Sequence, residues 1–522
     1  MNILMICTEK LPVPPVLGGA IQTYIAGSLP YLKNAHTITV LGVNDPSLPD
    51  EETIDGVRYV RIPGKVFTVY QEGVTQYLET NEFDLIHIFN RPRLVLPVRQ
   101  AAPNAKITLS MHNDMFSPEK INPEEAALAL EEVSNIVTVS DYIGNEISRL
   151  FPQAATKVKT IYSGVDTEQF LPGHHPKMRQ VRNELRRANG LENKTVLLFA
   201  GRLSHNKGVD RLIRALPELS KRFNDLALVI VGSKWFSQND VTDYVAYIRS
   251  LANRLSVPVV TTGFVAPNEI QNWFAAADLF VCTSVWQEPL ARVHYEAMAA
   301  GLPIVTTARG GNPEVIQLGE NGLVVENPED PSNFTEAISK ILSNKALMKR
   351  MGEKGRELAL TLYQWDRVGS EIIDVWNHAT LSQSTTTVPS ANKVTSLEKY
   401  RTEQRPNKAT AKKATAKKSA SNKAIAEKAT TKKSASNKAA AKKAIAKKNT
   451  VQTEQRRKQP SKPVERAVAN LANTTPTPTI QNQSGTNNRQ SALNKKVLKS
   501  FLQEMLIAST KQSLEKLARQ SK

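Results

Sequence analysis

Two cations stand in one short loop of this 522-residue chain, at a place where a phosphate could bind. The apolar run TVLLFA leads into GRLSHNKGVDRLI, which carries Arg202 and Lys207. In a loop between a strand and a helix, the two side chains and the helix N–H groups would meet an anion together. Each cation alone is equally compatible with a solvated surface position, but the pair in this loop predicts anion binding.

Two carboxylates follow in the segment SVWQEPLARVHYEAMAAGLPIV, with Glu288 just ahead of a predicted helix and Glu296 within it. Pro289 is well tolerated near a helix start. If the whole interval were helical, the carboxylates would lie about 12 Å apart along the axis, which suits two ends of an extended ligand. Without further context, Glu288 would be better explained as a favourable charge at a helix N-terminus, and Glu296 as one partner of a salt bridge.

Gly18, Gly19 and His112 also follow apolar runs. Glycines just before an amphipathic helix let backbone N–H groups approach an anion, although a tight turn explains them equally well. The pattern is not G-x-G-x-x-G, which argues against a dinucleotide dehydrogenase. A lone histidine after a strand is more often structural than functional.

The elements that position these residues form two alternating series. In residues 1–170 the predicted strands are NILMIC, TITVLG, VRYVRI, FDLIHIF, KITLSM, NIVTVS and VKTIY, with amphipathic stretches such as 20–33 and 123–133 between them. The second series has the strands TVLLFAG, LALVIVG, VPVVTTG, DLFVCTS, LPIVTT and GLVVE, and helices at 208–222, 241–255, 268–276, 292–300, 331–342 and 345–360. Apolar strands alternating with helices indicate parallel sheets covered on both faces.

The predicted fold class is therefore α/β, with two Rossmann-like doubly wound domains at 1–170 and 171–362. A helix at 363–380 is expected to pack back toward the first domain. Because ligands of such sheets bind beyond the carboxyl ends of the strands, the two sets of strand ends are expected to face a shared cleft.

Charge divides the chain sharply. Residues 381–522 hold 31 Lys and Arg, 7 Glu and no Asp, a net charge of +24, whereas residues 1–380 hold 37 basic and 42 acidic side chains, a net charge of −5. Cys7 and Cys282 both lie in apolar runs, which indicates free buried thiols and a reducing compartment. The N-terminus has no basic start, and no apolar stretch reaches about 18 residues, so neither a signal peptide nor a transmembrane helix is predicted. A cytoplasmic location is expected.

The basic tail repeats SASNKA at 419–424 and 434–439 among Lys-Lys-Ala units. Such a composition buries too little apolar surface to fold, so disorder is predicted for 381–490. Residues 491–522 have helical spacing, either for a docking or self-associating helix or for a marginal isolated one. The tail is expected to bind polyanions electrostatically, such as wall or coat polymers, and nucleic acid without sequence preference.

Residues 1–378 resemble the retaining glycosyltransferases of family 4, which have the GT-B fold. The resemblance is carried by the glycines at 18–19, TVSDYI at 138–143, SGVDTEQF at 163–170, GRL and KG at 201–208, GF at 263–264, the two glutamates and ARGGNPEVI at 308–316. The opening MICTEKLPVPPVLGGAIQTY and the core QEPLARVHYEAMAAGLPI are more narrowly similar to a spore-coat member of the family. The resemblance implies transfer of a sugar from a nucleotide diphosphate to a glycan or protein acceptor in the spore coat or cell envelope.

The resemblance also implies roles for the site residues. Glu296 would bind the ribose hydroxyls of the donor and Glu288 the transferred sugar, while Arg202 and Lys207 would neutralise the diphosphate. Gly18 and Gly19 would approach the donor phosphates from the other domain, and His112 would line the sugar and acceptor side. We thus expect Glu288, His112, Arg202 and Lys207 to serve catalysis.

This chain has Leu290 and Ala291 where many relatives have Phe-Gly. Their backbone N–H groups are expected to face the donor, while the changed side chains leave open the identity of the sugar and a reduced or lost activity. Retaining front-face transfer, implied by the family, needs no protein nucleophile. No Asp-x-Asp motif is present, and the expected transfer uses neither a metal nor another cofactor. Two alternatives stay open: a structural spore coat component with this fold and little catalysis, and a sugar epimerase that shares the fold.

Overall fold

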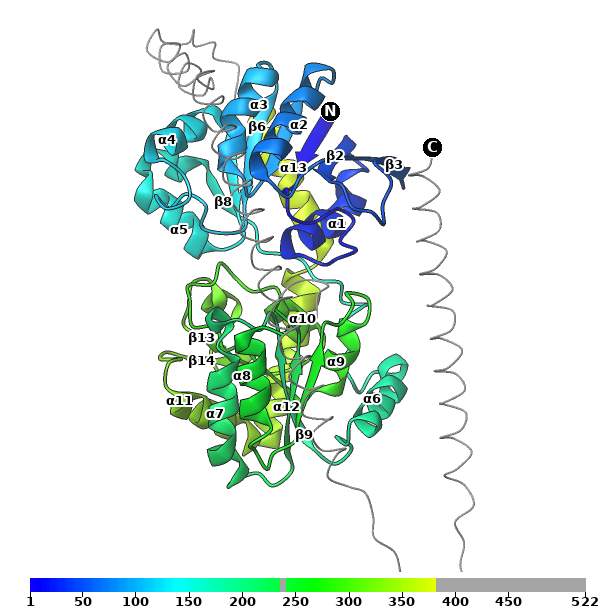
Figure 1. The fold of residues 1–522 in the computed structure, drawn as a ribbon, viewed down its shortest axis with the longest axis vertical. Helices are drawn as coiled ribbons and strands as arrows, with labels where there is room; N and C mark the ends of the chain where they lie inside the picture. The colour runs from blue at the N-terminus through cyan, green and yellow to red at the C-terminus, as the bar shows by residue number, and fades with distance from the viewer. Residues whose placement is uncertain (235–240, 382–522) are drawn as a thin grey trace, which may run out of the picture. The chain divides into compact units, whose positions relative to one another are not determined.

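The computed structural model describes residues 1–234 and 241–381, which form two largely parallel sheets with helices on their faces (Figure 1). The prediction of two doubly wound α/β domains is confirmed. We call them the first lobe, built on an eight-stranded sheet, and the second lobe, built on a six-stranded sheet. The predicted tail and its terminal helix lie outside the described residues, apart from Leu381, the last residue of a helix.

The sheet of the first lobe has the order β3-β4-β2-β1-β5-β6-β7-β8, and only the β3–β4 pair is antiparallel. Its strands are β1 (Asn2–Ile6), β2 (Thr37–Val43), β3 (Glu51–Ile54), β4 (Val57–Ile62), β5 (Leu85–Phe89), β6 (Lys106–Met111), β7 (Asn135–Thr138) and β8 (Val158–Thr160). All five residues of β5 are buried, as expected for a strand covered on both faces.

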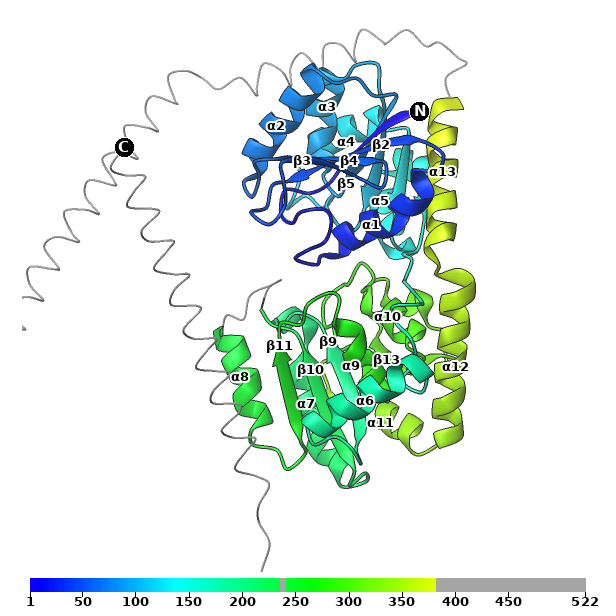
Figure 2. The same ribbon diagram turned by 90° about the vertical axis from the view of Figure 1, so that its right-hand side faces the viewer.

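The helices of the first lobe are α1 (Ala20–Leu32), α2 (Phe67–Glu79), η1 (Pro92–Leu94), α3 (Val95–Ala101), α4 (Pro123–Glu132), α5 (Asp141–Leu150) and η2 (Pro152–Lys157). Helix α13 (Trp365–Leu381) joins them, because its Trp376 and Ile372 share one buried cluster with Tyr24 of α1 and Met5 of β1. Figure 2 shows α13 on the side of this sheet opposite α2 and α3. Residues 365–381 thus complete the core of the first lobe.

The sheet of the second lobe has the order β11-β10-β9-β12-β13-β14 and is parallel throughout. Its strands are β9 (Thr195–Ala200), β10 (Leu226–Val231), β11 (Val259–Gly263), β12 (Leu279–Val281), β13 (Ile304–Thr307) and β14 (Gly322–Val325). Its helices are α6 (Pro176–Ala188), η3 (His205–Lys207), α7 (Val209–Ser220), α8 (Asp243–Ala252), α9 (Ile270–Ala276), α10 (Val293–Ala299), η4 (Asn312–Val315), α11 (Pro331–Leu342) and α12 (Lys345–Leu362).

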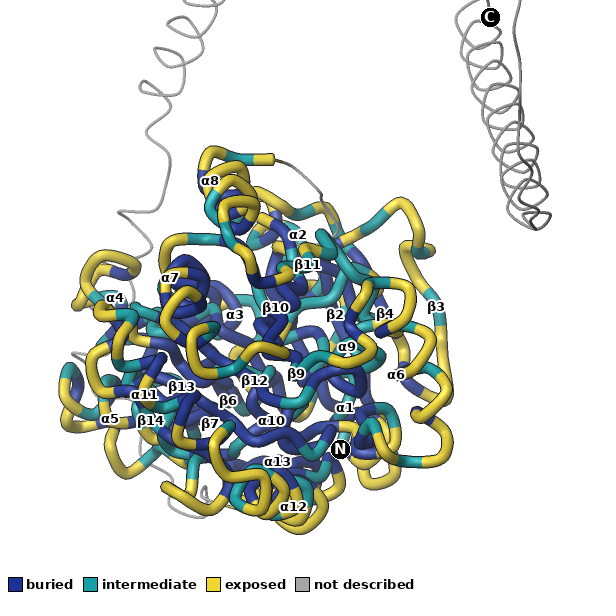
Figure 3. Tube along the Cα trace, turned by 90° about the horizontal axis from the view of Figure 1, so that it is seen from below, coloured by how far each residue is buried: buried dark blue, intermediate teal, exposed yellow. Residues whose placement is uncertain are grey.

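Two buried clusters cover the faces of this second sheet. Leu212 of α7 and Ile338 of α11 pack in one, while Phe274 of α9, Met298 of α10 and Leu358 of α12 pack in the other. Figure 3 shows the central strands in the buried colour and the outer turns exposed. None of the helices in the described part of the chain is long and apolar enough to span a membrane.

Each sheet has a point where the strand order reverses. The first strand of the first lobe, β1, lies between β2 and β5, and the first strand of the second lobe, β9, lies between β10 and β12. Ligands of open α/β sheets bind beyond the carboxyl ends of the strands at such switch points. The loops after β1, β5, β9 and β12 are therefore the places where functional side chains are expected.

Candidate active site

A partly buried ion pair lies at the switch point of the second lobe. Lys207, in η3 after β9, places its Nζ 2.6 Å from Oε2 of Glu288, which lies in the loop after β12. The same carboxylate oxygen accepts hydrogen bonds from Ser284 Oγ at 3.0 Å and from the indole Nε1 of Trp286 at 2.8 Å. The structure thus brings together a predicted cation and a predicted carboxylate from neighbouring strands.

Backbone contacts hold the two loops against each other. Thr283 donates its hydroxyl to the Lys207 carbonyl at 2.6 Å, and Val285 donates its N–H to the Asn206 carbonyl at 3.0 Å. Gly208 has a φ of 62°, and a Cβ there would lie 2.3 Å from the Thr283 carbonyl oxygen. Only glycine fits both the left-handed backbone and this close approach.

The environment of Glu288 keeps it charged. Burial disfavours the carboxylate, since the residue is 7% exposed, but the Lys207 charge and the donated hydrogen bonds outweigh burial and lower the pKa of Glu288. A bound diphosphate would have to draw Lys207 away from this partner.

Arg202 lies in the same loop as Lys207, two residues beyond the end of β9, and is partly buried. The turn before it is held to the neighbouring strand, because the Gly201 N–H donates to the Val231 carbonyl at 3.0 Å. Gly232 has a φ of 134°, and a Cβ there would lie 2.0 Å from the Gly201 carbonyl oxygen. These backbone contacts therefore hold the turn that leads into Arg202 in place.

The interval between the two glutamates is not helical throughout. The predicted spacing of about 12 Å assumed that it was, so that prediction does not apply. Helix α10 begins at Val293, so Glu288 and Pro289 lie in a loop rather than at the helix start. The physical reason is a competing set of contacts: the Glu288 carbonyl accepts the Gly311 N–H at 2.8 Å, and a Cβ at Gly310 would lie 2.0 Å from that same carbonyl oxygen.

Leu290 and Ala291 lie in this loop. The Ala291 N–H donates to Asn312 Oδ1 at 3.2 Å, so it is engaged within the protein. The Leu290 N–H has no hydrogen-bond partner within residues 1–234 and 241–381, while the Leu290 side chain packs in the core. The geometry therefore favours Leu290 over Ala291 as a backbone donor to a ligand.

Glu296 lies in the first turn of α10, with 14% of its side chain exposed. Its Oε1 is 3.8 Å from Nη2 of Arg292, one turn earlier. Burial raises the pKa of Glu296, and the charges of Arg292 and His294 oppose that rise. Within the described residues, no hydrogen bond or ion pair joins Glu296 to the Lys207–Glu288 pair.

Gly18 and Gly19 precede α1 with φ values of 78° and 110°. A backbone with these φ values is strained for a residue with a Cβ, so the turn itself favours glycine. This turn accounts for the residue type without a ligand, and contact with donor phosphates stays a prediction.

His112 directly follows β6 and is 8% exposed. Its N–H donates to Oδ1 of Asn90 at 3.0 Å, its ring meets the Tyr24 ring edge-on at 4.8 Å, and its Nε2 is buried without a hydrogen-bond partner among the described residues. Burial, together with the charges of His87 and Arg292, lowers the pKa of His112 to about 3. The ring is therefore neutral near pH 7 and suited to hydrogen bonding rather than to carrying charge.

A second partly buried ion pair, not predicted from the sequence, lies at the switch point of the first lobe. Glu9 follows β1 and Arg91 follows β5, and the guanidinium donates to the carboxylate at 2.6 and 3.0 Å. Glu9 is 3% exposed. The signal that could have revealed the pair is that Glu9 and Arg91 each lie in the loop after a predicted strand, as Lys207 and Glu288 do in the second lobe.

Direct contacts join the carboxyl edges of the two sheets. Glu314, in η4 after β13, accepts the N–H groups of Asp141 and Tyr142 at 2.8 and 2.7 Å, where α5 begins after β7. Tyr162 donates its hydroxyl to the same carboxylate at 3.0 Å. A carboxylate at a helix N-terminus is favoured by the helix dipole. The strand ends of the two lobes thus meet, as a site shared by both would require.

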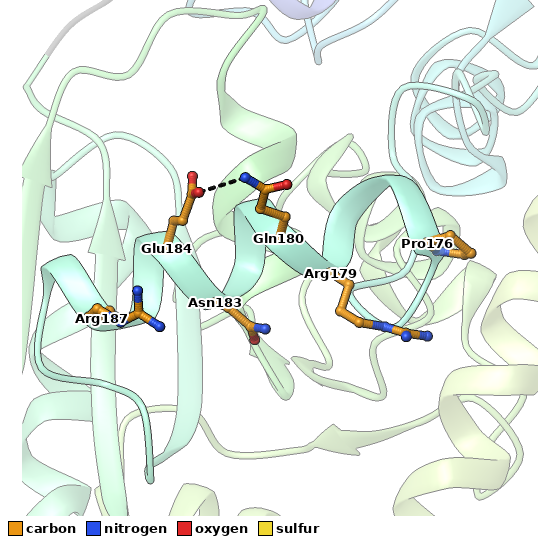
Figure 4. A pocket seen from close by; sticks show the side chains of 6 residues that line it. All are labelled: Pro176, Arg179, Gln180, Asn183, Glu184 and Arg187. Carbon is orange, nitrogen blue, oxygen red and sulfur yellow. Dashed lines mark hydrogen bonds between the residues drawn. The ribbon is translucent and has the colours of Figure 1, made fainter.

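A surface hollow along α6 lies apart from these residues (Figure 4). It is lined by Pro176, Arg179, Gln180, Asn183, Glu184 and Arg187. Gln180 donates to Glu184 within it at 2.8 Å, and none of the predicted site residues lines it. All six are exposed residues of α6, so the hollow does not lie at the strand ends, where the two ion pairs lie.

Comparison with known proteins agrees with this geometry. The model of the "Glycosyltransferase Family 4" domain matches residues 19–169, and that of "Glycosyl transferases group 1" matches residues 181–358. The chain is 43% identical over 376 residues to Spore coat protein SA of Bacillus subtilis (strain 168), covering 72% of this chain and 99% of that protein. It is 42% identical to the putative glycosyltransferase YtcC of the same organism, covering 72% and 92%.

Solved structures share the fold. The Anabaena protein Alr3699/HepE, crystallised with UDP, is 23% identical with a TM-score of 0.58, covering 72% of this chain and all of that one. Sucrose-phosphate synthase of Thermosynechococcus elongatus is 20% identical with a TM-score of 0.62, covering 73% and 99%. The strand orders, the two domain matches and the 43% identity together place this chain in the family 4 glycosyltransferases of the GT-B fold.

Proposed function

We propose that this glycosyltransferase takes a sugar from a nucleoside diphosphate and transfers it to an acceptor. The observation that carries the proposal is the Lys207–Glu288 pair at the switch point of the second lobe, with Arg202 in the same loop. The fold it shares with a protein crystallised with UDP is consistent with such a donor.

Breaking the anomeric C–O bond leaves negative charge on the departing diphosphate. Lys207 and Arg202, fixed on the loop after β9, would stabilise that charge more in the transition state than in the ground state. When Lys207 turns to the diphosphate, Glu288 is released and can accept hydrogen bonds from sugar hydroxyls. We propose that these cations take the place of a metal ion, so that activity persists in a chelator.

We propose that the transfer retains the anomeric configuration, with no protein nucleophile. Neutral His112 would donate or accept one hydrogen bond on the acceptor side through its unpartnered Nε2. The similarity to Spore coat protein SA favours an acceptor in the spore coat or cell envelope, with the enzyme acting in the cytoplasm or at the coat.

Substituting Glu296→Gln is expected to weaken nucleoside diphosphate binding by about 10- to 150-fold, because a hydrogen bond to a charged group contributes about 1.5–3 kcal/mol. Isothermal titration with UDP, GDP and ADP, and hydrolysis of their sugar conjugates, measures the effect. The matched control is Glu336→Gln on the exposed side of α11, which should bind as the wild type does. Equal affinity of the Glu296 variant and the wild type would remove Glu296 from the donor site.

The alternative is a structural coat component with little or no catalysis. The name of the similar spore coat protein favours it. The same titrations and hydrolysis assays distinguish the two functions. If no donor binds and none is hydrolysed, a structural function is favoured over transferase activity.

A further inference from the structure

Arg292 lies between the two proposed donor carboxylates, four residues after Glu288 and four before Glu296, yet it contacts the segment that connects the two lobes. Its Nη1 donates to Ser163 Oγ at 2.6 Å and to the Gly164 carbonyl at 3.2 Å. Both acceptors belong to residues 161–175, the connecting segment that leads from β8 to α6. Its other terminal nitrogen, Nη2, is the one that faces Glu296 at 3.8 Å.

The same guanidinium lies over the ring of Trp365, with Cζ 5.4 Å from the ring centroid. Trp365 begins α13, at the second place where the chain passes from one lobe to the other. A Cβ at Gly27 would come within 2.2 Å of the indole, and one at Gly164 within 2.5 Å, so the ring is closely packed. The Val165 N–H donates to the Tyr363 carbonyl at 2.8 Å. This hydrogen bond joins the two places where the chain passes between the lobes.

We propose that Arg292 is a positioning residue that couples Glu296 to the connecting segment, so that a ligand bound at Glu296 changes how the two lobes are held together. The guanidinium is planar and rigid, and its two terminal nitrogens serve the two partners at once. With 14% of its side chain exposed, it depends on those partners for compensation of its charge. A ligand that engages Glu296 therefore changes the balance of contacts that Arg292 makes with Ser163 and Gly164.

Coupling of this kind is reciprocal, and its usual size is about 5- to 150-fold in affinity. Lysine in place of Arg292 would keep a charge near Glu296, but it lacks the fork that reaches the connecting segment. The Arg292→Lys variant therefore distinguishes two roles of Arg292: balancing the charge of Glu296, and coupling Glu296 to the connecting segment.

Amide hydrogen exchange in the ligand-free full-length chain tests the coupling through six proteins: wild type, Arg292→Met and Arg292→Lys, each with and without Glu296→Gln. We expect Glu296→Gln to change exchange of the Val165 amide by about 5-fold or more when Arg292 is present. In the Arg292→Met and Arg292→Lys backgrounds the same substitution should have no effect. An equal change in every background, or no change in any, would overturn the proposal.

A second arm adds UDP or GDP, and it rests on the proposed function. In the wild type, either nucleotide should protect residues 161–175 from exchange, and in Arg292→Met this protection should be lost. The control Arg149→Met, on the exposed side of α5, should behave as the wild type does. If neither nucleotide binds any of the proteins, the proposed donor site fails, while the ligand-free comparison still decides whether Arg292 couples Glu296 to the segment.

Discussion

Lys207→Met is expected to lower the turnover of donor hydrolysis or transfer by about 10²- to 10³-fold, the loss that follows removal of one fixed donor to a developing negative charge. The substitution also leaves Glu288 buried without its cation, and breaking a buried pair in this way destabilises a protein by about 3–5 kcal/mol. We therefore expect a lower melting temperature together with the lost activity, measured by calorimetry and by single-turnover kinetics.

The double variant Lys207→Met/Glu288→Gln separates these two effects. A neutral amide no longer needs the ammonium, so stability should largely return while turnover stays low. Lys221→Met, whose side chain is 72% exposed at the end of α7, is the matched control and should change neither quantity. Wild-type turnover in Lys207→Met would show that this lysine does not serve the reaction.

A chain that ends at Gln364 is expected not to fold. It lacks α13, whose Val368, Ile372, Val375 and Trp376 are buried in the core of the first lobe. Each such side chain stabilises the folded state by about 1.5–3 kcal/mol, and a domain has only about 5–15 kcal/mol of stability. The truncated chain should therefore be insoluble or lack a cooperative unfolding transition.

The matched control is a chain that ends at Leu381, which keeps every contact described for α13. It should unfold within a few degrees of the full-length protein in differential scanning calorimetry. A soluble, cooperatively unfolding chain ending at Gln364 would contradict the assignment of α13 to the core of the first lobe.

Much of the fold follows from local patterns. Apolar, β-branched runs such as residues 195–200 cannot be solvated, and the structure buries them as strands. Helix α11 has the predicted bounds, since Pro331 and the Asp330 cap fix its start. Helices α2, α3, α5 and α6 were not predicted individually, and in α6 arginine and other polar side chains leave few apolar positions to mark the helix.

The candidate site could be predicted only in part. The Lys207 and Glu288 positions follow from the rule that polar residues after parallel strands gather at one edge. What the sequence could not predict are the partners: that Arg292 contacts Ser163, 129 residues away, and that Glu314 binds the start of α5. These contacts depend on how the two lobes pack, which no local periodicity encodes.

The most direct measurement is a crystal structure of the protein soaked with a nucleoside diphosphate that the titrations identify. The account predicts the diphosphate within hydrogen-bond distance of Lys207 and Arg202 at the end of β9, with the ribose hydroxyls on Glu296. A nucleotide bound elsewhere, with Lys207 still paired to Glu288, would contradict it.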